Sequence, residues 1–236
     1  MKEEDLVRSL KSINHVLKSA DIDYWLDAGT LLGAVRENRF LPWDYDIDIG
    51  AWQKDVSDIL KATSKLEKEG FEVIYFTLDK CIKILDNNSE IDINLYEQKD
   101  KMANRIWLVN NKKGEILDYL RWVLSTKRPE LKRSKVPKTL TKILHFLTKI
   151  LSDKHKEGLK NKILEKYKKS GCRIVKVSIP SSYFSDFSDF DFYDISVRVP
   201  KDPERYLEFR YGKDWRTPKK NYVYYKDDKS IVKKGK

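Results

Sequence analysis

The spacing of apolar and polar positions predicts that helices and strands alternate at the start of the chain. Apolar side chains recur at helical spacing between residues 4 and 20, which predicts an opening helix. Residues 24–26 are apolar throughout and predict a short buried strand. A second helix is expected after Gly29, with Thr30 as the residue that caps its N-terminus. In residues 45–51 the pattern changes to alternation, which predicts a strand.

The following residues predict one more helix and then a run of strands. A helical pattern spans residues 56–70, and Gly70 can end that helix in a left-handed conformation. The strands of the run are separated by polar breaks and are expected at residues 71–78, 81–87 and 91–97. Helices and strands in this order predict an α+β fold, in which helices flank one mixed sheet.

The second half of the chain contains an ambiguous stretch and then a lysine-rich helical stretch. Residues 105–109 are expected to be extended, whereas residues 115–124 fit either a strand or a helix. A stripe in the helical stretch at residues 137–170 can pack on a protein core or lie on an anionic surface. The stripe consists of Leu140, Ile143, Leu144, Leu147, Ile150 and Leu151. The chain then returns to mixed structure, with strands expected at residues 173–179 and 195–200 and a short helix at 202–212.

Composition and charge favour a folded protein with one strongly basic region. Hydrophobic residues make up 40% of the 236 residues, and the chain has only 9 Gly and 7 Pro. It has no long apolar run and begins with an amphipathic pattern, so a soluble, cytoplasmic protein is expected. The net charge of +11 is uneven, because residues 127–169 hold 15 basic and 4 acidic side chains. That segment is expected to carry a strongly positive field.

Three aspartates alternate with apolar residues in the segment PWDYDIDIG, residues 42–50. Side chains at every second position of a strand point the same way, so Asp44, Asp46 and Asp48 are expected to share one face. Neighbouring carboxylates repel one another when they are buried, and a divalent cation removes that repulsion. Mg²⁺ prefers oxygen ligands, commonly one or two carboxylates together with substrate phosphates. The segment therefore predicts a Mg²⁺ site, with Mn²⁺ as the alternative ion.

A solvated edge strand would also place aspartates on one face and apolar residues on the other. Metal binding is favoured because aspartate is depleted in strands and because another isolated acid, Asp92, lies in a second apolar strand, IDINL. Upstream, Gly29 and Thr30 offer free backbone N–H groups and a hydroxyl at the start of a helix, where the helix dipole favours a phosphate. The two segments together predict a site for a cation and a phosphate.

A Gly-Thr turn that opens a helix, an Asp-x-Asp strand and a third acid on a later strand resemble the nucleotidyltransferase superfamily. More narrowly, WLDAGTLLGAVRENRFLPWDYDIDIG resembles the LicD family, which includes bacterial phosphocholine transferases and ribitol-phosphate transferases. The stretch ISVRVPKDPERYLEFRYGKDWRTP resembles the closing motif of that family. The resemblance implies a nucleotidyltransferase-like fold with residues 1–125 as the catalytic core, residues 126–170 as a basic helical insertion and residues 171–236 completing the catalytic domain.

The resemblance also implies roles for the acidic residues. Asp46 and Asp48 would bind the Mg²⁺ ion and serve catalysis. Asp92 would complete the metal site or accept the proton of the acceptor hydroxyl. Asp44 would either support a metal ligand or contact the substrate.

Four further residues are expected to bind the substrate. Gly29 and Thr30 would contact a phosphate of the donor. Arg36, at the end of the helix that follows them, is expected either to reach a phosphate or to be a surface arginine. Arg216, in the closing motif, is a further candidate for a substrate contact.

By the same resemblance, the chain is expected to be a Mg²⁺-dependent phosphotransferase. It would transfer phosphocholine, ribitol phosphate or a similar phospho-alcohol from a CDP-linked donor to a hydroxyl of a glycan or lipid-linked oligosaccharide, and release CMP. The basic segment would hold it on anionic membrane, peripherally at the inner face. Two alternatives remain open: a nucleotidyltransferase that moves an NMP group onto a small molecule, and a non-catalytic basic module that binds RNA or membrane. Nucleic acid is not expected, because the basic segment has few aromatic side chains that could stack on bases.

Overall fold

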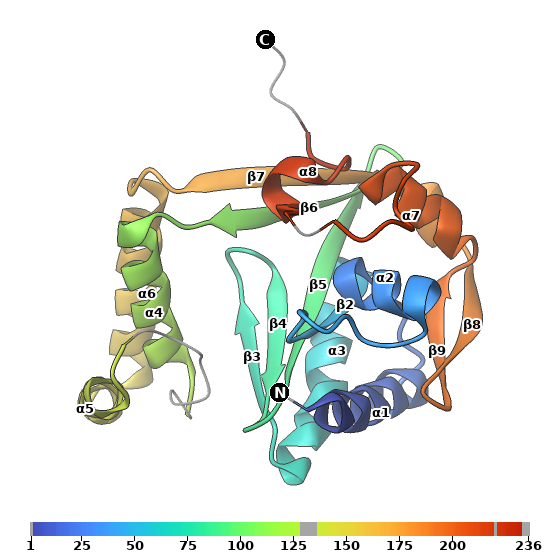
Figure 1. The fold of residues 1–236 in the computed structure, drawn as a ribbon. Helices are drawn as coiled ribbons and strands as arrows, with labels where there is room; N and C mark the ends of the chain where they lie inside the picture. The colour runs from blue at the N-terminus through green and yellow to red at the C-terminus, as the bar shows by residue number, and fades with distance from the viewer. Residues whose placement is uncertain (1, 128–135, 220, 233–236) are drawn as a thin grey trace. The chain divides into compact units, whose positions relative to one another are not determined.

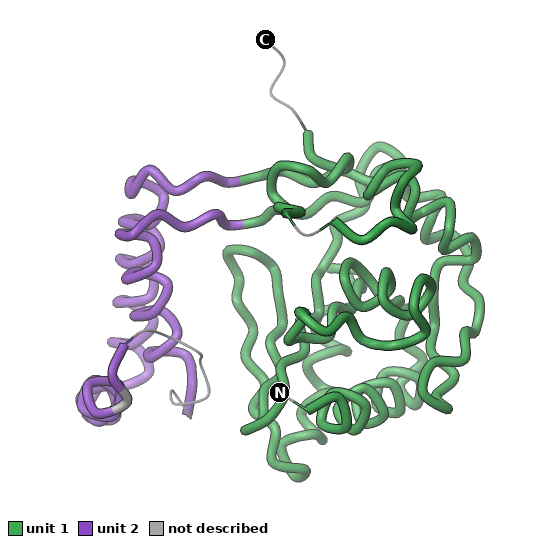
Figure 2. Tube along the Cα trace, viewed as in Figure 1, with its two compact units in different colours: residues 1–107, 175–236 green, residues 108–174 purple. Residues whose placement is uncertain are grey.

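The computed structural model describes residues 2–127, 136–219 and 221–232. The chain forms two compact units, one from residues 1–107 and 175–236 and the other from residues 108–174 (Figure 2). The division that we expected from the sequence, at 125/126 and 170/171, stays a prediction about domains. The second compact unit starts before the expected first boundary, at residue 108, and ends after the expected second boundary, at residue 174. It starts early because the helix at residues 112–125 packs with the two helices that follow it.

The first unit contains the mixed sheet that the sequence predicts (Figure 1). Its strands lie in the order β1-β2-β5-β4-β3, with β2 and β5 parallel and the other neighbours antiparallel. Strand β6 pairs with β5 and with β7. The strands are β1 (Tyr24–Leu26), β2 (Ile47–Trp52), β3 (Glu72–Phe76), β4 (Cys81–Leu85), β5 (Glu90–Lys99), β6 (Met102–Val109) and β7 (Arg173–Pro180).

Strands β2 and β5 have one apolar face and one polar face. Ile47 pairs with Ile91 and Ile49 with Ile93 in the parallel register, and all four side chains are fully buried. Since side chains alternate along a strand, the residues between them point to the opposite face. Asp48 lies beside Asp92 there, and Asp92 lies beside Lys83 of β4. The register of three strands therefore places two acids and a lysine in one row.

Helices cover the sheet of the first unit, and a separate hairpin packs beside it (Figure 1). The expected helix at residues 56–70 is an α-helix followed by a 3₁₀ segment, and Gly70 ends it with φ of +89°. The elements are α1 (Glu3–Ser19), α2 (Ala28–Glu37), the 3₁₀ segments Gln53–Asp55, Ser64–Glu69 and Ser181–Phe184, α3 (Val56–Thr63), the hairpin strands β8 (Phe187–Phe192) and β9 (Ile195–Pro200), α7 (Pro203–Tyr211) and α8 (Tyr224–Asp227).

The second unit contains three helices, α4 (Lys112–Ser125), α5 (Lys138–Lys149) and α6 (Asp153–Lys168). Helix α4 resolves the ambiguity at residues 115–124, because its buried residues Tyr119, Trp122 and Val123 recur at helical spacing. The stretch at 137–170 forms two helices rather than one, and the Ser152 side chain accepts a hydrogen bond from His155 N at the start of α6. In the described part of the chain, no helix has the length and hydrophobicity needed to cross a membrane.

Candidate active site

Asp44, Asp46 and Asp48 form a compact group of half-buried carboxylates. Each offers a carboxylate oxygen, and the three oxygens lie within 4.8 Å of one another. Only Asp48 belongs to strand β2, so the expectation that all three share the face of one strand is wrong. A turn closed by the Asp44 N–H and the Leu41 carbonyl precedes the strand, and Asp46 lies between that turn and β2. Proline at position 42 favours such a turn over a continuous strand.

Burial and mutual repulsion make the ionised form of this group unfavourable. Burial, together with the charge of Asp48, raises the pKa of Asp44 to about 6. Burial and the charge of Asp92 raise the pKa of Asp46 to about 8. Burial and the charge of Asp46 raise the pKa of Asp48 well above its usual range. A divalent cation between these oxygens would favour the ionised form and so lower the pKa of all three aspartates. The residues therefore fit a cation site.

Asp92 lies next to this group but already has a cation beside it. The Lys83 ammonium is 2.7 Å from each carboxylate oxygen of Asp92 and 2.5 Å from Glu90. Among the described residues, by contrast, no ion pair is formed by Asp44, Asp46 or Asp48. The structure thus brings Asp44 together with the two expected metal ligands, and it pairs the third expected ligand, Asp92, with a lysine.

Gly29 lets the Asp44 carboxylate lie against the start of helix α2. A Cβ atom at position 29 would be 2.0 Å from the Asp44 Oδ2 atom, which is closer than any non-bonded contact. The sequence predicted close approach of a phosphate to this glycine. The structure shows that a carboxylate of the aspartate group approaches it, and contact with a phosphate stays a prediction.

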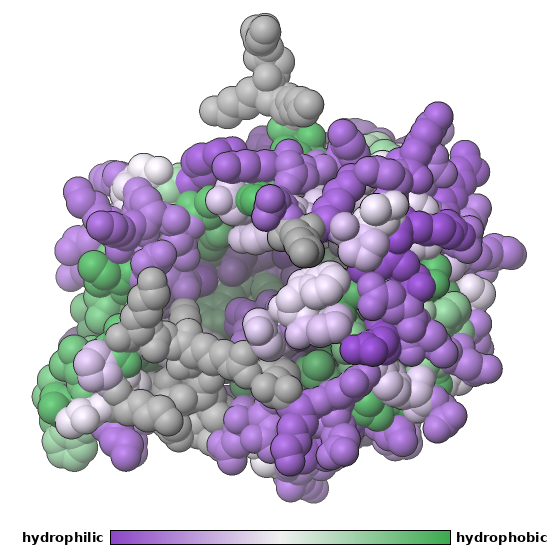
Figure 3. All heavy atoms as spheres, viewed as in Figure 1, coloured by the Kyte–Doolittle hydropathy of each residue, from purple (hydrophilic) through white to green (hydrophobic). Residues whose placement is uncertain are grey.

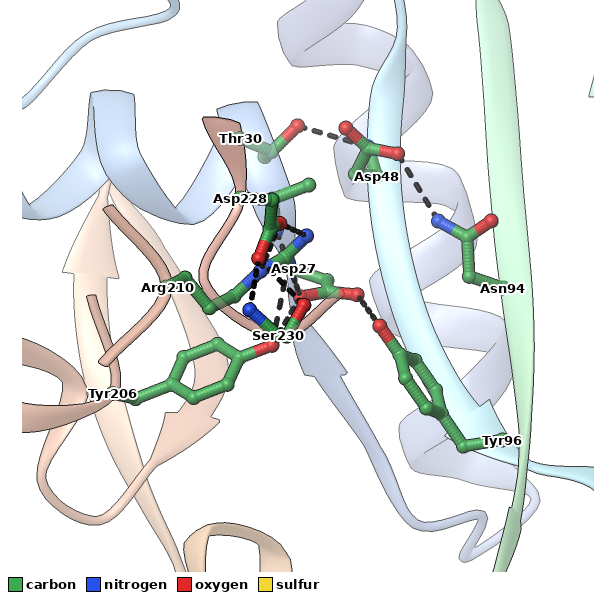
Figure 4. Close-up of polar contacts among 10 residues, drawn as sticks. Asp27, Thr30, Asp48, Asn94, Tyr96, Tyr206, Arg210, Asp228 and Ser230 are labelled. Carbon is green, nitrogen blue, oxygen red and sulfur yellow. Dashed lines mark hydrogen bonds and ion pairs between the residues drawn. The ribbon is translucent and has the colours of Figure 1, made fainter. Parts of the chain in front are cut away.

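Thr30 connects helix α2 to strand β2. Its buried Oγ1 atom accepts a hydrogen bond from the backbone N–H of Asp48 at 2.8 Å (Figure 4). The expectation that Thr30 caps the helix is wrong, because α2 begins at Ala28 and the Asp27 side chain accepts from the Ala28 N–H at 2.8 Å. The cap falls earlier because Asp27 is itself a good capping residue.

Asp27 is the centre of a buried polar network that the sequence did not reveal (Figure 4). Its carboxylate accepts hydrogen bonds from the hydroxyls of Tyr96 at 2.6 Å and Tyr206 at 2.7 Å, and from Arg210 at 2.7 Å. Arg210 in turn donates two hydrogen bonds to Asp228, at 2.9 and 2.6 Å. Burial raises the pKa of Asp27, but the Arg210 guanidinium and the two hydroxyls hold it below its usual value. The network thus keeps a fully buried carboxylate ionised.

This network supports an unusual backbone at the start of α2. Ala28 has a φ of 43°, in the left-handed region where a Cβ atom is strained. Such strain persists only where the surrounding contacts enforce it, and it is concentrated at functional sites. Asp27 also donates its backbone N–H to the carbonyl of Asp48 at 3.0 Å. The network therefore fixes the helix start relative to the aspartate group.

The two arginines expected to bind substrate make contacts elsewhere. The Arg36 side chain is largely buried and pairs with Glu37 at 2.7 Å, and it donates to the Trp215 carbonyl at 3.4 Å. Arg216 is exposed, pairs with Glu204 at 2.6 Å and lies 4.2 Å from the centre of the Trp215 ring. The hydrogen bond from Arg36 to Trp215 joins α2 to the segment after α7. A substrate role for either arginine stays a prediction.

Two polar residues of the neighbouring strands were missed from the sequence. Asn94 of β5 donates to the Asp48 carboxylate at 3.1 Å. Arg105 of β6 lies close enough that its charge lowers the pKa of Asp48 against the larger effect of burial. Its guanidinium is 5.6 Å from the centre of the Tyr96 ring, and its buried Nε atom has no hydrogen-bond partner among the described residues. The sequence feature that could have pointed to Arg105 is that it is a single charged residue in the otherwise apolar strand RIWLV.

Comparison with known families supports the resemblance noted in the sequence. Residues 21–118 match the model described as LicD/FKTN/FKRP, nucleotidyltransferase domain. This stretch is therefore similar to the nucleotidyltransferase domain of the LicD/FKTN/FKRP family. It includes the aspartate group, Asp92 and the start of α2, whereas Arg210 and Asp228 lie outside the matched residues.

Known relatives match the chain over limited stretches. Ribitol 5-phosphate transferase FKRP of Homo sapiens is 41% identical over 61 residues, which are 24% of this chain and 12% of that protein. The uncharacterized protein RP689 of Rickettsia prowazekii is 35% identical over 74 residues, which are 31% of this chain and 28% of that protein. The matches therefore span well under half of these relatives. Among solved structures, the lincosamide antibiotic adenylyltransferase LnuA aligns with a TM-score of 0.39 and 13% identity, over 88% of this chain and 85% of that one.

Proposed function

We propose that the protein transfers a phospho-alcohol from a CDP-linked donor to a hydroxyl of a glycan or lipid-linked oligosaccharide and releases CMP. The observation that carries this proposal is the group formed by Asp44, Asp46 and Asp48, which is half-buried, mutually repulsive and set against the start of α2 in a stretch similar to the LicD/FKTN/FKRP domain. Because the relative FKRP is a ribitol 5-phosphate transferase, ribitol 5-phosphate is the first group to test, and phosphocholine is the second.

The three aspartates would hold a Mg²⁺ or Mn²⁺ ion. Their oxygens are hard ligands of the kind these cations prefer, and their proximity fits a single ion. When bound, the cation would neutralise charge on the donor diphosphate and on the departing phosphate. Asp92 would either join the ligand set or accept the proton of the acceptor hydroxyl, and Lys83 holds its carboxylate in place for both roles.

The reaction is a displacement at the phosphorus that carries the alcohol. A bond forms between this phosphorus and the acceptor oxygen, the bond from the phosphorus to the bridging oxygen of CMP breaks, and the acceptor proton passes to a base such as Asp92. We expect Arg105 to contact the negatively charged diphosphate, because its charge acts on Asp48 and its buried Nε atom has no hydrogen-bond partner in the described part of the chain. Catalysis would consist chiefly of positioning and charge stabilisation.

The decisive experiment follows CMP release from a panel of CDP-alcohols in the presence of Mg²⁺, with glycan acceptors added. CMP release from CDP-ribitol or CDP-choline that is lost in Asp48→Asn supports the proposal, provided that circular dichroism shows the variant to be folded. Pyrophosphate release from CTP without CMP release would instead establish transfer of an NMP group. Full activity in Asp48→Asn would overturn the role of the aspartate group.

A further inference from the structure

Helix α5 of the second unit exposes most of its large apolar side chains. The sequence left open whether this stripe packs on a core, and the structure shows that most of it does not. Five residues are between 45% and 72% exposed: Leu140 (45%), Ile143 (54%), Phe146 (65%), Leu147 (53%) and Ile150 (72%), the last at the C-cap. In Figure 3 the hydrophobic surface gathers over α5, at the lower left.

The side of α5 that packs within the unit is less apolar than the side that faces outward. Thr141 is buried, and its hydroxyl forms a hydrogen bond with the Tyr119 hydroxyl of α4. At 3.6 residues per turn, the five exposed apolar residues fall within an arc of about 120° on another side of the helix. An amphipathic helix of a soluble domain normally turns its apolar arc inward. Here the arc is available to a partner.

The charges around this arc indicate what kind of partner fits. Exposed Lys142 and Lys149 border the apolar arc, and α5 itself contains no acidic residue. Helix α6 adds further exposed lysines, and residues 127–169 hold 15 basic and 4 acidic side chains. An apolar arc rimmed by lysines matches an anionic lipid surface, where the apolar side chains enter the headgroup boundary and the lysines meet the headgroups.

Two other occupants fit these observations less well. A second copy of the chain would place the lysine-rich surface of one α5 against that of the other, and like charges would oppose the contact. RNA would use the lysines but not the aliphatic arc, and Phe146 is the one aromatic side chain of α5 that could stack on a base. A lipid surface uses both features.

We propose that α5 docks the protein on anionic membrane, with its apolar arc inserted and its lysines on the headgroups. This proposal goes beyond the proposed reaction and does not depend on it. It predicts that the full-length chain floats with vesicles of phosphatidylcholine and phosphatidylglycerol, but not with vesicles of phosphatidylcholine alone. High salt should weaken the binding, because it screens the lysines.

Paired variants test the two features separately. Ile143→Ser combined with Phe146→Ser should lower the partition coefficient by about tenfold or more, because each side chain loses its buried apolar area in the membrane. Lys142→Gln combined with Lys149→Gln should lower it by about tenfold, and only on anionic vesicles. Ile174→Ser is the matched control, since Ile174 is 47% exposed in the same unit but belongs to β7, which begins at the other end of that unit from α5 (Figure 1). It should bind as the unchanged chain does.

Three outcomes would overturn the proposal. The first is flotation that is unchanged in the Ile143/Phe146 variant, with circular dichroism showing the same fold. The second is self-association, seen by sedimentation, that this variant abolishes while no vesicle is bound, which would make the arc an interface between copies. The third is salt-sensitive RNA binding without vesicle binding. A catalytically inactive Asp48→Asn chain should still float, so failure of the docking proposal and failure of the proposed reaction can be distinguished.

Discussion

The backbone N–H of Asp48 donates its hydrogen bond to the buried hydroxyl of Thr30. This bond joins the helix that begins the site to the strand that carries one of its carboxylates. Thr30→Val keeps the shape of the side chain but leaves the Asp48 N–H without its partner. It should lower the free energy of unfolding by about 1–3 kcal/mol in urea titrations, whereas Thr30→Ser should be milder. Equal stability of the valine and serine variants would contradict this role.

Gly29→Ala should weaken cation binding without unfolding the protein. The new Cβ atom would meet the Asp44 Oδ2 atom at 2.0 Å, so this carboxylate must move away from its two neighbours. Mn²⁺ affinity, measured by calorimetry, should fall by about tenfold or more, in line with the effect of misplacing groups that support a metal ligand. Gly158→Ala in α6 is the matched control, because nothing lies within 4 Å of its added Cβ atom. An unchanged Mn²⁺ affinity in Gly29→Ala would contradict the placement of Asp44.

The metal-free protein should lose stability as the pH rises. The pKa of Asp46 is raised from 3.8 to about 8, so the folded chain retains a proton that the unfolded chain releases. The stabilisation from this group is complete below the unfolded pKa and disappears as the pH rises through the folded pKa. Urea midpoints in the presence of EDTA should therefore fall between about pH 5 and pH 8. Asp46→Asn should flatten this dependence, and an equally steep slope in that variant would count against the assignment.

Arg210→Met should be among the most destabilising single changes in the first unit. It leaves Asp27 and Asp228 buried without their cation, which typically costs about 3–5 kcal/mol. Arg198→Met is the comparison, because Arg198 pairs with a half-exposed Asp23 and such pairs contribute about 0–1 kcal/mol. Chemical denaturation of both variants would show the difference, and similar losses would mean that the buried network is not what stabilises the site.

Arg105→Gln should weaken binding of the donor more than it slows turnover. A charge-assisted hydrogen bond to a phosphate contributes about 1.5–3 kcal/mol, so the KM for the CDP-linked donor should rise by about tenfold or more. Arg8→Gln removes an arginine whose side chain is 54% exposed on α1 and should leave the KM unchanged. A fall in kcat alone, without a change in KM, would place Arg105 outside the donor site.

The local patterns in the sequence predicted most of the strands and helices, because alternation and helical spacing report directly on which side chains are buried. They also identified Asp44, Asp46 and Asp48 and the nearby glycine. They did not predict the ion pair between Lys83 and Asp92, because that pair depends on the register of β4 against β5, which no local pattern fixes. Arg210 was missed for a similar reason, since its partner Asp27 is 183 residues away along the chain.

The outward-facing arc of α5 could not be predicted either. The periodicity of a helix shows that it has an apolar side, but it does not show what that side contacts. In this chain a threonine hydroxyl of α5 forms a hydrogen bond with α4, and most of the larger apolar residues of α5 remain exposed.

The long separation between Asp27 and Arg210 has a consequence for how the protein is made. Ribosomes add about 5–20 residues per second, so roughly 10–40 s pass between the synthesis of these two residues. The second unit, at residues 108–174, is synthesised within that interval, before Arg210 is added. Until Arg210 and Asp228 arrive, the Asp27 carboxylate has no cation and the start of α2 cannot be held in its final conformation. All residues of the basic helical unit are therefore synthesised before the residues that fix the start of α2 beside the aspartate group.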